Sequence, residues 1–181
     1  MADPAAGNDA VAGIRAGQEP AVRQETTSVY LATADTMNSQ RPSGQPCQAE
    51  CTIPSDPVEA RRVQEAIERA LQANSYTDHD IFGIKLALEE ALVNAIKHGN
   101  QMDRSKTVRV AYFIDPNRFE IDITDEGCGF DPCDVPDPTA VENLERPCGR
   151  GLMLMRHYMT EVQFTGRGNC VSMKKLRNGK K

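Results

Sequence analysis

Apolar residues recur every three or four positions between Ile81 and His98, and this spacing predicts an amphipathic helix. The run contains no proline, and Asp78 or Asp80 can cap its start. One face of the expected helix is an apolar stripe formed by Ile81, Ile84, Leu88, Leu92 and Ala95. We expect this stripe to pack on the core, so the rest of the chain is organised around this helix.

Polar side chains form a second row on the same helix, away from the stripe. Glu90, Asn94 and His98 are spaced four residues apart and therefore share one face. The residues beside this row are small, namely Gly83, Ala87 and Ala91. A carboxylate and a carboxamide one turn apart, with space above them, suit a metal–phosphate group. The same pattern also occurs on the solvated face of an ordinary amphipathic helix.

The segment before this helix predicts a strand and a further helix. Residues 47–53 alternate weakly between apolar and polar positions, which is typical of an edge strand. Ser55 or Asp56 can cap a helix that has Pro57 in its first turn and runs to about Ala73. Its expected buried positions are Val58, Val63, Ile67 and Leu71.

After Asn100 the apolar period changes to two, which predicts β-strands. The predicted strands cover residues 108–114, 119–123, 162–165 and 170–176, with a helix over 149–159. A turn at residues 115–118 joins the first two of these strands into a hairpin. Residues 131–148 contain four prolines, and so long a connection inside a domain is typical of a lid over a site.

The length of 181 residues and a hydrophobic content of 39% support one folded domain with a single core. Residues 1–46 are rich in small and polar residues, so we predict a disordered N-terminal tail. The domain is expected to cover residues 47–176, and residues 177–181 are expected to form a basic C-terminal tail.

Charge and composition exclude several classes of protein. The net charge of −5 argues against nucleic-acid binding, and no apolar run approaches the ~20 residues that span a bilayer. The N-terminus lacks the basic start and apolar run of a signal peptide, so we expect a cytoplasmic protein without membrane contacts. The six cysteines contain no Cys-x-x-Cys pair and are expected to be free thiols.

Two glycine-containing segments complement the polar row on the central helix. Asp125 ends a predicted strand and is followed by Gly127 and Gly129, which allow the backbone to approach a bulky ligand. The segment 149–152, Gly-Arg-Gly-Leu, begins a predicted helix, where free N–H groups and the helix dipole favour an anion. Each signal is weak alone, but their order and the connection between them point to one phosphate-bearing ligand.

Together these segments resemble a known superfamily. Residues 94–99 (NAIKHG), 125–130 (DEGCGF) and 149–152 (GRGL) resemble the N, G1 and G2 boxes of the GHKL ATPases, which include gyrase B, Hsp90, histidine kinases and MutL. Within it, the sequence is similar to the small anti-sigma factor serine/threonine kinases. The resemblance covers residues 50–176 and implies the α+β Bergerat fold. That fold is a two-layer α/β sandwich with helices on one face of a mixed, mostly antiparallel sheet.

The resemblance also implies roles for individual residues. Glu90 matches the catalytic acidic residue that activates the attacking group, Asn94 the Mg²⁺ ligand, and Asp125 the acceptor for the adenine amino group. Glu89 is the competing candidate for the base, but it points about 100° away from Asn94. The further residues expected to bind ATP are Gly127, Gly129, Gly149, Arg150, Gly151 and Leu152. For Arg150, a solvated position is an equal alternative.

The implied activity is that of an ATP- and Mg²⁺-dependent protein serine/threonine kinase. Its expected substrate is a STAS-type anti-anti-sigma protein, and a sigma factor is expected to compete for binding. The resemblance further implies a homodimer. The alternative is a non-catalytic module of the same fold, in which ATP gates the binding of a partner protein.

Overall fold

The computed structural model describes residues 44–129 and 150–177. The strands are β1 (Cys47–Pro54), β2 (Thr107–Ile114), β3 (Arg118–Asp125), β4 (Glu161–Thr165) and β5 (Cys170–Leu176). The helices are α1 (Pro57–Ala73), α2 (Asp78–Val93) and α3 (Arg150–Tyr158), with a short π-helix η2 (Asn94–Gly99) directly after α2. The expected lid at residues 131–148 and most of the expected N-terminal tail lie outside the described residues.

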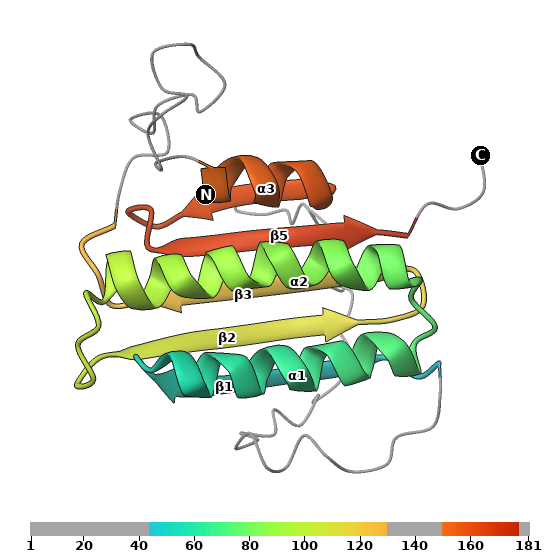
Figure 1. Ribbon diagram of the computed structural model, residues 1–181, viewed down its shortest axis with the longest axis horizontal. Helices are drawn as coiled ribbons and strands as arrows, with labels where there is room; N and C mark the ends of the chain where they lie inside the picture. Colours follow the sequence, from blue (N-terminus) through green and yellow to red (C-terminus); the bar gives the residue numbers. More distant parts are fainter. Residues whose placement is uncertain (1–43, 130–149, 178–181) are drawn as a thin grey trace, which may run out of the picture.

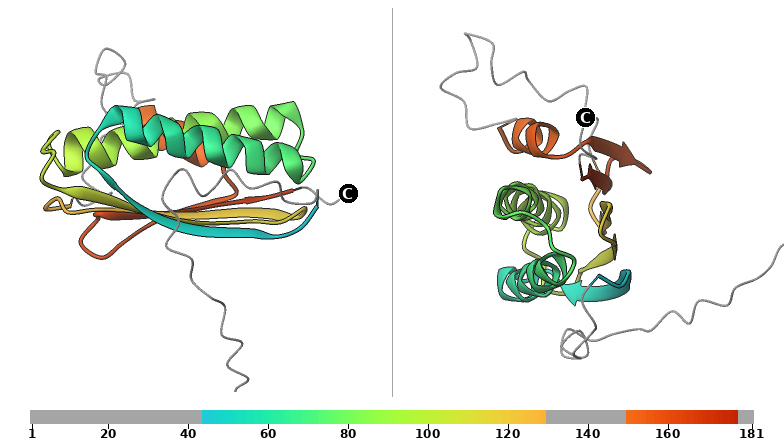
Figure 2. Two further views of the ribbon diagram at one scale, coloured as in Figure 1. Left: turned by 90° about the horizontal axis from the view of Figure 1, so that it is seen from below. Right: turned by 90° about the vertical axis from the view of Figure 1, so that its right-hand side faces the viewer.

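The five strands form one sheet in the order β1-β2-β3-β5-β4. Every neighbouring pair among them is antiparallel. All three α-helices cover the same face of this sheet (Figures 1 and 2). The predicted α+β, two-layer architecture is therefore confirmed. The resemblance implied a mixed, mostly antiparallel sheet, and the described strands pair only in the antiparallel sense.

The core lies between the sheet and the helices, where the strand register aligns apolar side chains. Cys51, Val110, Ile123, Val171 and Phe164 pair in succession across the whole sheet. The first four are buried, and Phe164 packs against the core from the edge strand β4. Because side chains alternate between the two faces of a strand, this register places one apolar row beneath the helices.

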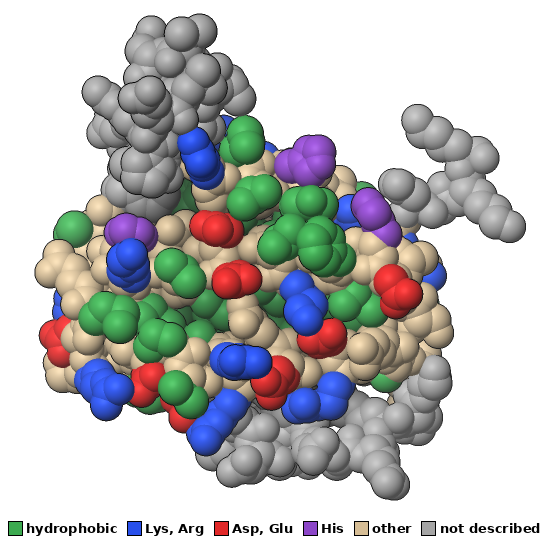
Figure 3. Space-filling model, in the orientation of Figure 1, with side chains coloured by type: hydrophobic (Ala, Val, Ile, Leu, Met, Phe, Trp, Pro, Cys, Tyr) green, Lys and Arg blue, Asp and Glu red, His purple; other side chains and the backbone are tan. Residues whose placement is uncertain are grey.

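The helix α1 begins at one of its two predicted caps. The Asp56 carboxylate accepts a hydrogen bond of 2.9 Å from the Val58 N–H, and Pro57 lies in the first turn. The buried positions are Ala60, Val63, Ala66, Ile67 and Leu71. Val58 is 60% exposed, so its predicted burial is wrong. It lies about 200° around the helix from the buried Ala60, on the side of α1 that is turned away from the core. Figure 3 shows the helical face of the molecule, where hydrophobic side chains lie among charged ones.

The helix α2 is capped by Thr77, and not by either predicted aspartate. The Thr77 hydroxyl oxygen accepts a hydrogen bond of 3.1 Å from the Asp80 N–H. Asp78 and Asp80 instead lie in the first turn, where their charge interacts favourably with the helix dipole. The predicted stripe is buried along its full length, at Ile81, Ile84, Leu88, Leu92 and Ala95.

The end of the helix α3 packs closely on the first half of α2. A Cβ on Gly83 would lie 2.7 Å from the Tyr158 ring, so the glycine permits this approach. The small residue at this end of the polar row therefore makes room for α3. Lys175 on β5 donates a hydrogen bond of 2.8 Å to the Tyr158 carbonyl and thereby ties the end of α3 to the sheet.

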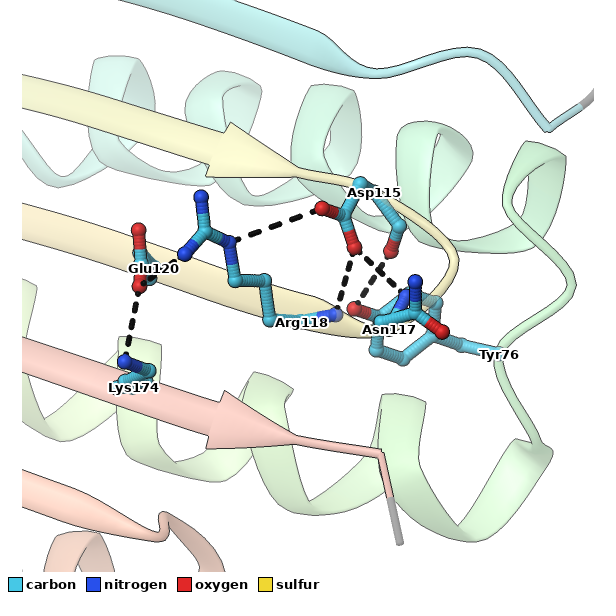
Figure 4. Close-up of polar contacts among 6 residues, drawn as sticks. All are labelled: Tyr76, Asp115, Asn117, Arg118, Glu120 and Lys174. Atoms are coloured by element: carbon cyan, nitrogen blue, oxygen red, sulfur yellow. Dashed lines mark hydrogen bonds and ion pairs between the residues drawn. The ribbon is translucent and has the colours of Figure 1, made fainter. Parts of the chain in front are cut away.

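A polar cluster closes the end of the molecule at the β2–β3 turn (Figure 4). The Asp115 carboxylate accepts hydrogen bonds from the N–H groups of Asn117 and Arg118 at 2.7 and 2.9 Å. The Tyr76 hydroxyl donates to the Asp115 carbonyl at 2.9 Å, which joins the α1–α2 connection to this turn. The hairpin expected at residues 115–118 is thus confirmed, and its turn is fixed by side chains.

Four cysteines lie in the described ranges, and all four are free: Cys47, Cys51, Cys128 and Cys170. Burial raises the pKa of the Cys51 thiol to about 11, so this core thiol stays protonated and unreactive at neutral pH. Across residues 44–129 and 150–177, no helix has the length and apolar character needed to cross a membrane.

Candidate functional site

Three elements meet at the left-hand end of the molecule in Figure 1, opposite the β2–β3 turn. They are the end of α2 with η2, the end of β3 and the start of α3. Gly99 lies directly against Asp125, and Gly151 lies directly against Glu90. The described parts of the three sequence motifs are therefore brought together at one place.

Glu90 lies against the first turn of α3. A Cβ on Gly151 would overlap the Glu90 carboxylate, so the glycine leaves room for this carboxylate beside the start of α3. Glu90 and Asn94 are both half-buried and lie one turn apart on the same side of α2. Glu89, the competing candidate for the base, is exposed to solvent. Of the two glutamates, only Glu90 thus faces the segment expected to hold phosphate.

The helix widens into the π-helix η2 immediately after the Glu90 turn. The Asn100 N–H donates to the Ala95 carbonyl at 2.8 Å, five residues back. Gln101 and Met102 then adopt positive φ angles of 56° and 60°, which end the helix. The predicted row through His98 assumed regular α-helical spacing, and the π-helix changes that spacing after Asn94. Single π-turns inside helices occur frequently at functional sites.

The carboxylate of Asp125 is packed against the end of η2. A Cβ on Gly99 would overlap this carboxylate, so a glycine is required where the helix ends. Burial raises the pKa of the Asp125 carboxyl above its ordinary value. The hydrogen bond from the Gly127 N–H and the charges of Arg167 and Lys106 act in the opposite direction and offset part of this rise.

The two glycines after Asp125 are both required by their surroundings. The Gly127 N–H donates to Asp125 Oδ1 at 2.7 Å, and a Cβ on Gly127 would lie 2.6 Å from the same oxygen. Gly129 has a φ of +81°, and a Cβ there would overlap the Arg167 carbonyl. The backbone of this turn therefore lies tightly between η2 and the β4–β5 hairpin.

The third motif lies only partly within the described residues. Gly149 falls outside them, while Arg150 begins α3 and is exposed. Leu152 is partly buried and packs against the hydrophobic core. Its ATP-binding role stays a prediction, and core packing accounts for its position.

Sequence reasoning missed two asparagines that hold the Asp125 turn. Asn100 is completely buried, and its side chain hydrogen-bonds to the Thr107 carbonyl and the Glu126 N–H at 2.8 and 2.9 Å. The Asn169 amide donates to the Asp125 carbonyl at 2.7 Å. An asparagine directly after a helix and one in a tight turn were the available signals, but the sequence does not show their distant partners.

Comparison with known proteins identifies the family. Residues 53–175 match the histidine kinase-like ATPase domain, which covers most of the folded part of the chain. The chain belongs to this family. The resemblance to the GHKL ATPases inferred from residues 94–99, 125–130 and 149–152 is thus confirmed.

Relatives of this histidine kinase-like ATPase domain include kinases and anti-sigma factors. The chain is 27% identical to the serine-protein kinase RsbW of Bacillus subtilis, over 73% of this chain and 87% of the relative. It is 35% identical to RsbW of Bacillus licheniformis, over 57% and 69% of the two chains. It is also 32% identical to the anti-sigma F factor of Clostridium perfringens, over 56% and 76%. These matches support its place among the anti-sigma factor kinases.

The donor set of this ATPase domain fits a magnesium nucleotide. Among the described residues, Asp125 Oδ1 accepts one hydrogen bond and Oδ2 accepts none, so an acceptor is available for an amino group. No three His, Cys, Asp or Glu side chains gather into a metal site in the described ranges. Mg²⁺ does not require such a cage, because it is commonly held by one protein oxygen together with phosphates and water. The Asn94 amide oxygen is a hard donor of this kind.

Proposed function

We propose that this chain is a Mg²⁺- and ATP-dependent protein serine/threonine kinase of the anti-sigma factor type. In this proposal its substrate is a STAS-type anti-anti-sigma protein, and a sigma factor competes for binding to the kinase. The observation that carries the proposal is the position of Glu90, half-buried beside Asn94 and against Gly151 at the start of α3. The names of two relatives, a serine-protein kinase and an anti-sigma F factor, support the kinase activity and the sigma factor. The resemblance to the anti-sigma factor kinases supplies the STAS-type substrate.

Each part of the site has one task in this proposal. The Asp125 carboxylate accepts a hydrogen bond from the adenine amino group, and Asn94 holds the Mg²⁺ ion. The backbone at the start of α3 holds the phosphates, because helix N-termini present free N–H groups. ATP supplies the phosphoryl group, and its magnesium ion neutralises the charge that develops during transfer.

Glu90 is the proposed general base. Its carboxylate accepts the proton of a serine or threonine hydroxyl as that oxygen attacks. For this, the hydroxyl must come within about 3 Å of the carboxylate. The position of Glu90 beside the proposed phosphate-binding segment supports this role.

The test is incubation of the full chain with labelled ATP, Mg²⁺ and candidate STAS proteins, followed by identification of the labelled residue. We expect label on one serine or threonine of the partner. Glu90→Gln should retain ATP binding but lower transfer about 10²–10⁴-fold, whereas Glu89→Gln should leave transfer nearly unchanged. Equal activity of Glu90→Gln and the wild type would remove Glu90 from its role.

Binding without transfer would favour the second class of function, an ATP-gated binding module. In that case ATP would change the recovery of the partner protein in a pull-down, but no label would reach the partner. Failure to recover either a STAS protein or a sigma factor, with ATP or with ADP, would contradict the proposed partners.

A further inference from the structure

The turn that carries Asp125 is held from two sides by asparagine side chains. On one side, the Asn169 amide donates to the Asp125 carbonyl at 2.7 Å. On the other, Asn100 Oδ1 accepts the Glu126 N–H at 2.9 Å. The Gly127 N–H is satisfied by the Asp125 carboxylate itself. Successive backbone polar groups of this turn therefore have defined partners, which leaves the carboxylate little freedom to move.

Asn169 extends the sheet beyond the last paired residues of β3 and β5. The ladder ends at the pair Thr124–Cys170, and the Asp125 N–H then donates to the Asn169 carbonyl at 3.0 Å. The Asn169 side chain returns a hydrogen bond to the Asp125 carbonyl. Its amide thus takes the place of a backbone donor, which fixes the peptide groups on both sides of the Asp125 Cα atom.

The turn between β4 and β5, which carries Asn169, also touches Gly129, the second glycine after Asp125. The Gly129 backbone lies against the Arg167 carbonyl with no room for a side chain. The charge of Arg167 also lowers the pKa of the Asp125 carboxyl. Turn residues 166–169 therefore constrain the position and the ionisation of the carboxylate, although they lie more than 40 residues later in the chain.

Asn100 connects the opposite side of the turn to the helix. It is completely buried, its own N–H donates to the Ala95 carbonyl, and its side-chain amide donates to the Thr107 carbonyl. One side chain therefore joins η2, the start of β2 and the Glu126 N–H. A buried amide with both ends satisfied fixes geometry strongly, because breaking either bond leaves a buried polar group without a partner.

We propose that Asn169 and Asn100 are positioning residues that set adenine selectivity by fixing the Asp125 carboxylate. This inference rests on the proposed ATP site and deepens it. Neither side chain touches the nucleotide in this account. Both act on the peptide groups that carry Asp125, so that its acceptor oxygen lies where the 6-amino group of adenine arrives.

The test compares ATP with purine riboside triphosphate, which lacks the 6-amino group. Calorimetry on the full chain measures both dissociation constants for the wild type and for Asn169→Ala. The wild type should bind ATP at least about tenfold more tightly than the analogue, since an unpaired Asp125 acceptor is costly. Asn169→Ala should weaken ATP binding about tenfold and leave analogue binding within about twofold, so that the preference disappears.

The analogue separates positioning from a general loss of structure. A variant that is merely less folded would lose affinity for both nucleotides equally, and that result would overturn the proposal, as would an unchanged preference. Asn117→Ala, in the exposed turn at the other end of the sheet, is the matched control and should keep the wild-type preference. The same ratio measured for Asn100→Ala keeps the test decisive if one variant folds poorly. A wild type that binds both nucleotides equally, or neither, would refute the proposed site itself.

Discussion

The substitution Gly127→Ala inserts one methyl group between the two halves of the proposed adenine site. Its Cβ would lie 2.6 Å from Asp125 Oδ1 and closer still to the Gly99 carbonyl oxygen. Contacts of Cβ atoms below 3.0 Å are essentially never observed, so the carboxylate and the end of η2 must separate by several tenths of an ångström. Overpacking of this kind costs about 1–3 kcal/mol.

We expect the dissociation constant for Mg²⁺-ATP to rise about 5- to 100-fold in Gly127→Ala, because the displaced groups are those proposed to hold the adenine ring. Isothermal titration calorimetry measures this change, and thermal unfolding measures the accompanying loss of stability. Gly83→Ala is the matched control, since its Cβ would lie 2.7 Å from the Tyr158 ring, near the start of α2 and away from the site. It should alter the melting temperature but keep the wild-type dissociation constant within about twofold.

Two results would refute this reasoning. An unchanged ATP affinity in Gly127→Ala would show that the contact between Gly127, Gly99 and Asp125 does not shape the site. An equal loss of affinity in Gly83→Ala would show that the effect follows general stability and not the displaced carboxylate.

Three further predictions follow from other contacts. Asp125→Asn should weaken ATP binding about 5- to 100-fold, yet raise the stability of the free protein at neutral pH. Burial raises the folded-state pKa of Asp125, so the wild type loses stability as the pH rises through that pKa. The difference in the free energy of unfolding between the variant and the wild type should therefore close in acid. Asn94→Ala should remove most of the difference between ATP affinities measured with Mg²⁺ and with EDTA; an undiminished difference would exclude Asn94 as the ligand. Tyr76→Phe removes the hydrogen bond to the Asp115 carbonyl and should lower the free energy of unfolding in urea by about 0.5–1.5 kcal/mol, with ATP affinity unchanged.

The repeating elements of the fold were predictable because their signal is local. Helical spacing in α2 and alternation in β2 and β3 follow directly from which side chains must be buried, and the structure keeps those patterns. The choice among neighbouring polar residues was less certain. Thr77 and Asp78 can both cap a helix, and the sequence alone does not show which backbone N–H each one reaches.

The candidate site was predictable only as a set of segments. Glu90, Asn94 and Asp125 were recognisable from their motifs. The change from α- to π-helix at Asn94 and the contact of Gly99 with Asp125 have no local signal in the sequence. Asn100 and Asn169 act through partners that are distant in sequence or belong to the backbone. Backbone partners leave no mark on residue type, so the sequence gives no reason to connect these two asparagines with Asp125.

The central claim is that nucleotide binds where the end of α2, the end of β3 and the start of α3 meet. Amide chemical-shift mapping of the isotope-labelled full chain, titrated with Mg²⁺-ATP, tests this location most directly. The account predicts the largest shifts at Gly99, Gly127 and Gly151, with little change at Asn117 on the opposite end of the sheet. Shifts centred on the β2–β3 turn or on the open face of the sheet around Ser172, or no shifts at all, would contradict it.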